Sequence, residues 1–177
     1  MRTADSADAL VAALLELDRH VGRAGWDQPP RLFALVLTDV LARAEPALSR
    51  QLGLRTTDAG GLSGALTAVE QEDFASSGDL TRDLAQVEWP ESVYGCALTT
   101  VRTFLPAAYE ADLPDDPEAA AAAVAAHRQR QEIRVVVGAD RAGNRHGVGR
   151  LASRPDELLG APDLVPGLAS ALAHTLC

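Results

Sequence analysis

The stretch Val93-Tyr-Gly-Cys-Ala-Leu-Thr-Thr-Val-Arg-Thr-Phe-Leu105 is a thirteen-residue run without proline or acidic residues. Its β-branched and aromatic residues are typical of a long, mostly buried strand. Pro90 precedes the run and Pro106 follows it, so both ends carry a residue that interrupts regular structure. We therefore predict that this run is the central strand of a sheet, paired on both sides, with Cys96 shielded from solvent.

Other strands are predicted on either side of this run. Arg31–Leu37 precedes it and is an apolar run short enough for an interior strand, and Leu62–Glu72 alternates between apolar and polar residues as a strand does. A hairpin follows, with its turn at residues 142–144 and a return strand at 146–152. Its register sets Ile133, Val135 and Val137 across from Leu151, Gly149 and Gly147. We expect one strand of this hairpin to form an edge of the sheet.

Helical spacing of apolar residues predicts the helices. The segments are residues 6–23, 40–52 with a break at Pro46, 80–87, 117–126, and a C-terminal helix capped by Asp163. The Ala-rich segment 117–126 offers little side chain to pack, so we expect it near the surface or pressed close to a sheet, where small residues allow approach. Together the elements predict one α+β domain spanning 1–177, with a mixed, largely antiparallel sheet of about five strands covered by helices. Because strands and helices alternate through residues 31–137, an α/β fold with two β-α-β halves is the alternative.

Charge and composition exclude several classes of protein. The 177 residues carry a net charge of −9, and all sixteen basic residues are arginine. An acidic chain of this kind is a poor general nucleic-acid binder, because phosphate neutralisation needs a basic surface. No apolar run approaches the roughly 20 residues that span a bilayer, and Asp5 and Asp8 stand where a signal peptide would be positively charged. We therefore expect a cytoplasmic protein that binds neither nucleic acid nor membrane.

The sequence contains no recognisable catalytic pattern. There is no lysine for a phosphate-binding loop and no Gly-x-Ser-x-Gly nucleophile elbow. The four histidines are scattered, which argues against a metal site. Cys96 lies among apolar neighbours, where burial would raise the pKa of a thiol and make it inert. We accordingly assign no catalytic residue, no metal ligand and no cofactor.

One candidate site comes from charge asymmetry. Residues 128–154 contain seven arginines and two acids, a net charge of +5, which leaves −14 for the rest of the chain. Arg134, His146 and Arg150 could converge on one face of the hairpin and bind an anionic ligand or an acidic partner. Alternatively, this face meets acidic surface elsewhere in the same molecule.

A second candidate is Trp26 with Asp27, which precede the tandem prolines Pro29 and Pro30. A stiff proline loop can present an aromatic side chain for binding. The alternative is that Trp26 packs the first helix against the sheet.

Three segments together resemble an uncharacterised actinobacterial protein family. They are Gly25–Leu32, the Leu113–Asp116 loop leading to Gln131–Gly138, and Gly160–Leu168. The resemblance implies a bacterial cytosolic protein and carries over no site residues. For function we expect a non-enzymatic cytosolic binding or adaptor domain whose partner is another protein, present as a monomer or as a homodimer formed through helices. The alternative is an enzyme or sensor for a small anionic ligand held by the arginine-rich hairpin.

Overall fold

The computed structural model describes residues 3–56, 64–111 and 113–177. Its strands are β1 (Arg31–Leu37), β2 (Leu66–Glu70), β3 (Gly95–Phe104), β4 (Gln131–Asp140), β5 (Arg145–Leu151) and β6 (Arg154–Ala161). They form one sheet in the order β2-β1-β3-β4-β5-β6, and every neighbouring pair is antiparallel. The predicted α+β class is therefore confirmed, with six strands, and the α/β alternative with parallel halves is wrong.

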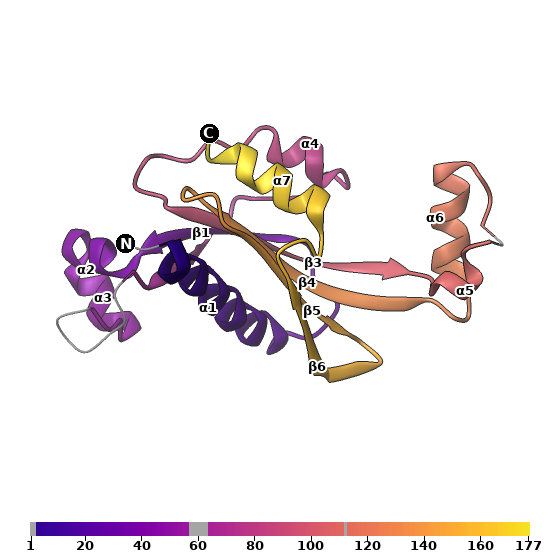
Figure 1. Cartoon of the computed structure of the whole chain (residues 1–177), viewed down its shortest axis with the longest axis horizontal. Helices are drawn as coiled ribbons and strands as arrows, with labels where there is room; N and C mark the ends of the chain where they lie inside the picture. Colours follow the sequence, from indigo (N-terminus) through magenta and orange to yellow (C-terminus); the bar gives the residue numbers. More distant parts are fainter. Residues whose placement is uncertain (1–2, 57–63, 112) are drawn as a thin grey trace.

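The helices are α1 (Thr3–Gly22), α2 (Thr38–Ala44), α3 (Pro46–Leu52), α4 (Leu80–Leu84), α5 (Ala107–Glu110), α6 (Pro117–Ala126) and α7 (Pro166–Thr175). Helix α1 covers one face of the sheet, and α7 covers the other with α4 beside it (Figure 1). The break predicted at Pro46 separates α2 from α3, because proline is tolerated at the start of a helix but not inside one.

Both faces of the sheet carry a hydrophobic core, one under α1 and one under α7. Successive side chains of a strand point to opposite faces, so the buried stretches of β1 and β4 are apolar at consecutive positions. The core under α1 contains Leu10, Leu14, Leu17, Val21, Phe33, Leu35, Val136 and Val148. The core under α7 contains Leu32, Cys96, Leu98, Val135, Val137, Leu168, Leu172 and Leu176.

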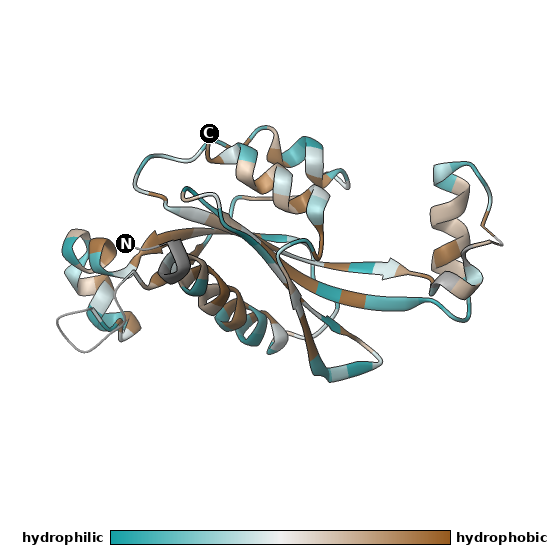
Figure 2. Cartoon of the chain, in the orientation of Figure 1, coloured by the Kyte–Doolittle hydropathy of each residue, from teal (hydrophilic) through white to brown (hydrophobic). Residues whose placement is uncertain are grey.

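The central strand lies where the sequence predicts it. β3 pairs with β1 over Gly95–Thr99 and with β4 along its whole length, and Cys96 is fully buried. From Thr100 onward β3 no longer pairs with β1, and beyond Arg102 the pairing of β4 with β5 has ended as well. The ends of β3 and β4 therefore form a short two-stranded ribbon that carries α5 and α6 (Figure 1). No residue of α6 is buried, so of the two placements predicted for the Ala-rich segment the one near the surface is confirmed. Figure 2 shows its apolar residues standing away from the sheet.

The hairpin has the predicted register, with Ile133, Val135 and Val137 opposite Leu151, Gly149 and Gly147. Its predicted place at a sheet edge is wrong, because β6 pairs with β5 beyond it. The sequence did not predict β6, whose Arg-Pro-Asp-Glu start has low strand propensity and whose residues are all exposed or half-exposed. The edges of the sheet are therefore β2 and β6.

Two smaller differences concern the ends of elements. Helix α7 is capped by Val165 and begins at Pro166, so Asp163 does not cap it. Strand β2 occupies Leu66–Glu70 within the predicted Leu62–Glu72. Residues 62 and 63 of the predicted strand lie outside the described residues.

Candidate functional site

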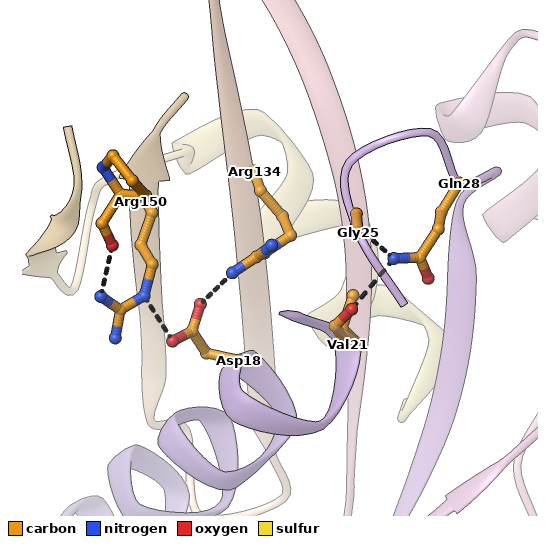
Figure 3. A network of polar contacts seen from close by, with 7 residues as sticks. Asp18, Val21, Gly25, Gln28, Arg134 and Arg150 are labelled. Atoms are coloured by element: carbon orange, nitrogen blue, oxygen red, sulfur yellow. Dashed lines mark hydrogen bonds and ion pairs between the residues drawn. The ribbon is translucent and has the colours of Figure 1, made fainter. Parts of the chain in front are cut away.

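Two of the three hairpin residues predicted to form a site lie side by side. Arg134 on β4 and Arg150 on β5 are directly opposite each other, so their side chains leave the sheet on the same face. This is the face covered by α1, because their neighbours Val136 and Val148 belong to the core under that helix. Both guanidinium groups reach Asp18, in the last part of α1 (Figure 3).

One carboxylate is shared by both arginines. Arg134 Nη2 donates to Asp18 Oδ1 at 3.3 Å, and Arg150 Nε donates to Asp18 Oδ2 at 2.8 Å. Arg150 Nη1 also donates to the carbonyl oxygen of Pro155, at 2.8 Å. The Asp18 side chain is 2% exposed and that of Arg134 is 7% exposed, whereas Arg150 keeps 23% of its side chain in contact with solvent. The Arg134–Asp18 contact is therefore a buried ion pair, and Arg150 forms its outer side.

Arg134 is the less completely paired of the two arginines. Its guanidinium offers five N–H donors, yet its hydrogen bond to Asp18 is a long one and its buried Nε has no partner. The guanidinium also lies over the ring of Trp26, at 4.8 Å from the ring centroid, which is the geometry of a cation–π contact. Gly22 leaves room for this arrangement, because a Cβ at that position would lie 3.1 Å from Arg134 Nη2.

The loop that carries Trp26 is fixed by hydrogen bonds. Gln28 Nε2 donates to the carbonyl oxygens of Val21 and Gly25 (Figure 3), and Gln28 Oε1 accepts from Arg31. Gly25 has a φ of +88°, a left-handed value that glycine adopts readily. Arg31 in turn donates to both oxygens of Glu70, and this hydrogen bonding lowers the pKa of Glu70. The indole is thus held beside Arg134 by a chain of contacts that reaches across to β2.

These residues surround a shallow surface cavity of about 450 Å³, which we call the arginine hollow. Its lining consists of Asp18, Arg19, Gly22, Arg23, Trp26, Arg134, Arg150 and Pro155. Four arginines and one aspartate give the lining a net charge of +3. The C-terminal end of α1 subtracts about half a charge through the helix dipole, so the hollow remains strongly positive in a chain that is acidic as a whole.

The remaining predicted residues do not join the hollow. His146 is on the same face but pairs with Gly138, four residues along β5 from Arg150 and so about 13 Å away. Burial lowers the pKa of His146, which favours the neutral ring. Asp27 is exposed and does not line the hollow.

The sequence analysis missed Asp18, although the sequence contains a signal for it. Asp18 is four residues after Leu14 and three before Val21, so it lies on the buried stripe of an amphipathic helix. A lone acid on such a stripe needs a buried cationic partner. The net charge of +5 for residues 128–154 had already indicated that the hairpin contains such cations.

Other chemistry is not evident in the described parts of the chain. Burial raises the pKa of Cys96 to about 11, so its thiol is not an activated nucleophile. Within residues 3–56, 64–111 and 113–177, no group of three or more His, Cys, Asp or Glu side chains is placed to hold a metal ion. The helices in these same ranges are all too short or too polar to cross a membrane.

The family model for PPA1309-like proteins matches residues 10–177, which include every residue that lines the hollow. The chain belongs to the PPA1309-like protein family. The resemblance to an uncharacterised family is confirmed at this level. No curated protein and no solved structure matches the chain. The family name implies no activity, and the arginine hollow is the feature of this PPA1309-like protein that points to a function.

Proposed function

We propose that this PPA1309-like protein is a non-enzymatic binding domain that takes up an anionic group at the arginine hollow, in the cytoplasm of an actinobacterium. The observation that supports this proposal is Arg134. It is a buried cation that shares one carboxylate with Arg150, and its Nε has no partner. Burying a charge is costly unless it is fully paired. A bound anion would supply the negative charge that these two arginines need in addition to the single carboxylate of Asp18.

A binding role fits the hollow better than catalysis. Among the described residues that line the hollow, Asp18 is the only acid, and each of its carboxylate oxygens already accepts from an arginine. A carboxylate occupied in this way is poorly placed to remove a proton from a ligand. The other lining side chains are arginines, an indole and a proline, and none of them is a common nucleophile.

The test is a thermal-shift and calorimetric screen of phosphates, nucleotides and carboxylates at low salt. Charge-assisted hydrogen bonds contribute roughly 1.5–3 kcal/mol each, so Arg150→Ala should weaken anion binding about tenfold or more. Arg150→Lys should restore only part of the affinity, because the planar fork of donors is lost. Arg102→Ala is the matched control, since it removes the same charge from an exposed position on β3.

Because Arg150 also contacts Asp18, its loss could lower stability as well as affinity. Arg23→Ala avoids this difficulty, because Arg23 is an exposed residue at the rim of the hollow. It should weaken anion binding and leave the melting temperature of the free protein nearly unchanged. If no anion in the screen shifts the wild-type melting temperature at low salt, the proposal is wrong.

We also propose that the chain is a monomer or pairs through its helices. The outer strand β6 begins with Arg154, Pro155, Asp156 and Glu157, and charges and proline discourage pairing between sheet edges. Light scattering should then show no dimer joined through β6. A dimer that becomes monomeric in Leu159→Lys, a change at an exposed position of β6, would contradict this proposal.

A further inference from the structure

From the charge and the hydrogen-bond donors of the arginine hollow, we infer that its ligand is a phosphate monoester, bound as the dianion, and not a carboxylate. This inference rests on the proposed function, because it names the anion that the hollow takes up. The same chemical group could come from a small phosphorylated metabolite or from a phosphorylated residue of another protein.

The first argument is charge balance. After subtraction of about half a charge for the end of α1, the lining keeps an excess of between two and three positive charges. A carboxylate supplies a single negative charge and would leave more than one positive charge uncompensated. A phosphate monoester carries about −1.5 to −2 at pH 7, which brings the hollow close to neutrality.

The second argument is the number of available donors. Of the five N–H groups on each guanidinium, Arg134 uses one in the protein and Arg150 uses two. The Nε of Arg134 is itself buried, so the donors that Arg134 can offer a ligand are those of its Nη atoms. Asp18 has already taken the place that a bound carboxylate would occupy between the two arginines. The terminal oxygens of a phosphate number three instead of two, and arginine is the preferred side chain for binding them.

The third argument is that the binding groups are held in place before a ligand arrives. Arg134 is fixed by Asp18 and by the ring of Trp26, and Arg150 is fixed by Asp18 and the Pro155 carbonyl. A phosphate would therefore meet two ordered guanidinium groups. At the rim, Arg19 on the last turn of α1 and Arg23, just after the end of that helix, are exposed and can turn toward the ligand. Ordered donors in the centre with mobile charges around them are suited to a compact, highly charged group.

The experiment is isothermal titration of the whole protein at low salt with O-phosphoserine, inorganic phosphate, acetate and succinate. At pH 7.5 the two phosphates should bind at least about tenfold more tightly than either carboxylate. Lowering the pH to 5.5 should weaken the binding of O-phosphoserine several-fold, because its second pKa is near 6. The charged groups that face the ligand are Asp18, Arg19, Arg23, Arg134 and Arg150, with no histidine among them. The loss of affinity for O-phosphoserine between pH 7.5 and pH 5.5 therefore reports the change in charge of the phosphate.

The variants separate the hollow from non-specific attraction. Arg150→Ala should lose at least tenfold in affinity for O-phosphoserine, and Arg23→Ala should lose a few-fold with a weaker dependence on salt. Arg102→Ala, the control with the same change of charge, should bind like the wild type. Circular dichroism and melting curves of each variant check that the fold is intact. If Arg102→Ala weakens binding as much as Arg23→Ala does, the attraction is non-specific and the inference is overturned.

Two further results decide the remaining alternatives. If acetate or succinate binds as tightly as phosphate, the inference is wrong although the proposed function stands, and if no anion binds, both are wrong. A phosphoserine peptide with neutral flanking residues then identifies the source of the group. Binding at least tenfold tighter than that of O-phosphoserine indicates a protein partner, and equal binding indicates a small phosphorylated molecule.

Discussion

Asp18 gives the sharpest test of the structure, because a single carboxylate compensates two arginines. Replacing it with asparagine keeps the shape of the side chain and removes the negative charge. Breaking one side of a buried ion pair costs about 3–5 kcal/mol, since the partner is left charged and uncompensated. Here the cost falls mainly on Arg134, which is 7% exposed, because Arg150 at 23% exposure can be hydrated.

We therefore expect Asp18→Asn to lower the free energy of unfolding by about 3–4 kcal/mol. For a chain of this size the melting temperature would decrease by about 6–16 °C. Equilibrium unfolding in urea at pH 7, followed by circular dichroism, measures the difference directly. Because the pair is buried, 0.5 M salt should change it little. Asp8→Asn is the matched control, since Asp8 is exposed on the same helix, and its effect should stay below about 0.5 kcal/mol.

A double variant tests whether the cost has the cause that we assign to it. If the penalty comes from the uncompensated charge of Arg134, then replacing both groups with apolar residues should recover much of it. Asp18→Leu combined with Arg134→Met should accordingly be more stable than Asp18→Asn alone. A loss below about 1 kcal/mol in Asp18→Asn, or a double variant less stable than the single one, would refute the reasoning.

Three further predictions concern the sheet and the side chains that hold it. Leu98→Ala should cost about 2–5 kcal/mol in urea unfolding, because Leu98 is fully buried in the central strand. A thiol reagent at pH 8 should label only Cys177 in the native protein, because Cys177 is exposed while burial raises the pKa of Cys96 to about 11. Rapid labelling of both cysteines would show that the central strand is not buried as described. The hydrogen bond from Arg31 lowers the pKa of Glu70 below its ordinary 4.5, so this carboxylate stabilises the fold above that pH and the contribution is lost as the pH falls further. Glu70→Gln should therefore reduce the acid-induced loss of stability in unfolding curves measured below pH 4.5, and an unchanged curve would argue against the ion pair.

The parts of the fold that the sequence predicted are those with a strong local signal. The turn at residues 142–144 sets the register of the hairpin, and a one-residue shift in pairing would exchange the side chains of β4 between the two cores. This is why the register with β5 could be predicted residue by residue. β6 has no such signal, because its exposed side chains are not selected for packing and it is held mainly by its backbone pairing with β5. Strands of this kind can be predicted only when the strand that they pair with is already known.

The candidate site could be predicted only in part. The excess of arginine in the hairpin pointed to Arg134 and Arg150, but their carboxylate partner lies 116 and 132 residues away in the sequence. Nothing local indicates which helix will cover that face of the sheet. The proline loop indicated Trp26, whereas its contact with Arg134 depends on how α1 ends and on the space left by Gly22. His146 was predicted as a site residue because it shares the strand face with Arg150. It does not reach the hollow, because it lies four residues away from Arg150 along β5.

The two-stranded ribbon formed by the ends of β3 and β4, residues 103–104 and 131–132, has a thermodynamic consequence. Beyond Thr99, β3 has no second neighbour, and α6 at its tip has no buried residue. A two-stranded ribbon without a core is only marginally stable in water, so this arm should open and close many times while the rest of the domain stays folded. Amide protons of Thr103 and Phe104 should accordingly exchange with deuterium well before those of Cys96–Thr99 in the same strand. The protein would then consist of a cooperative body and an appendage that melts independently, and inserted residues at the tip would alter the reach of the appendage without weakening the body.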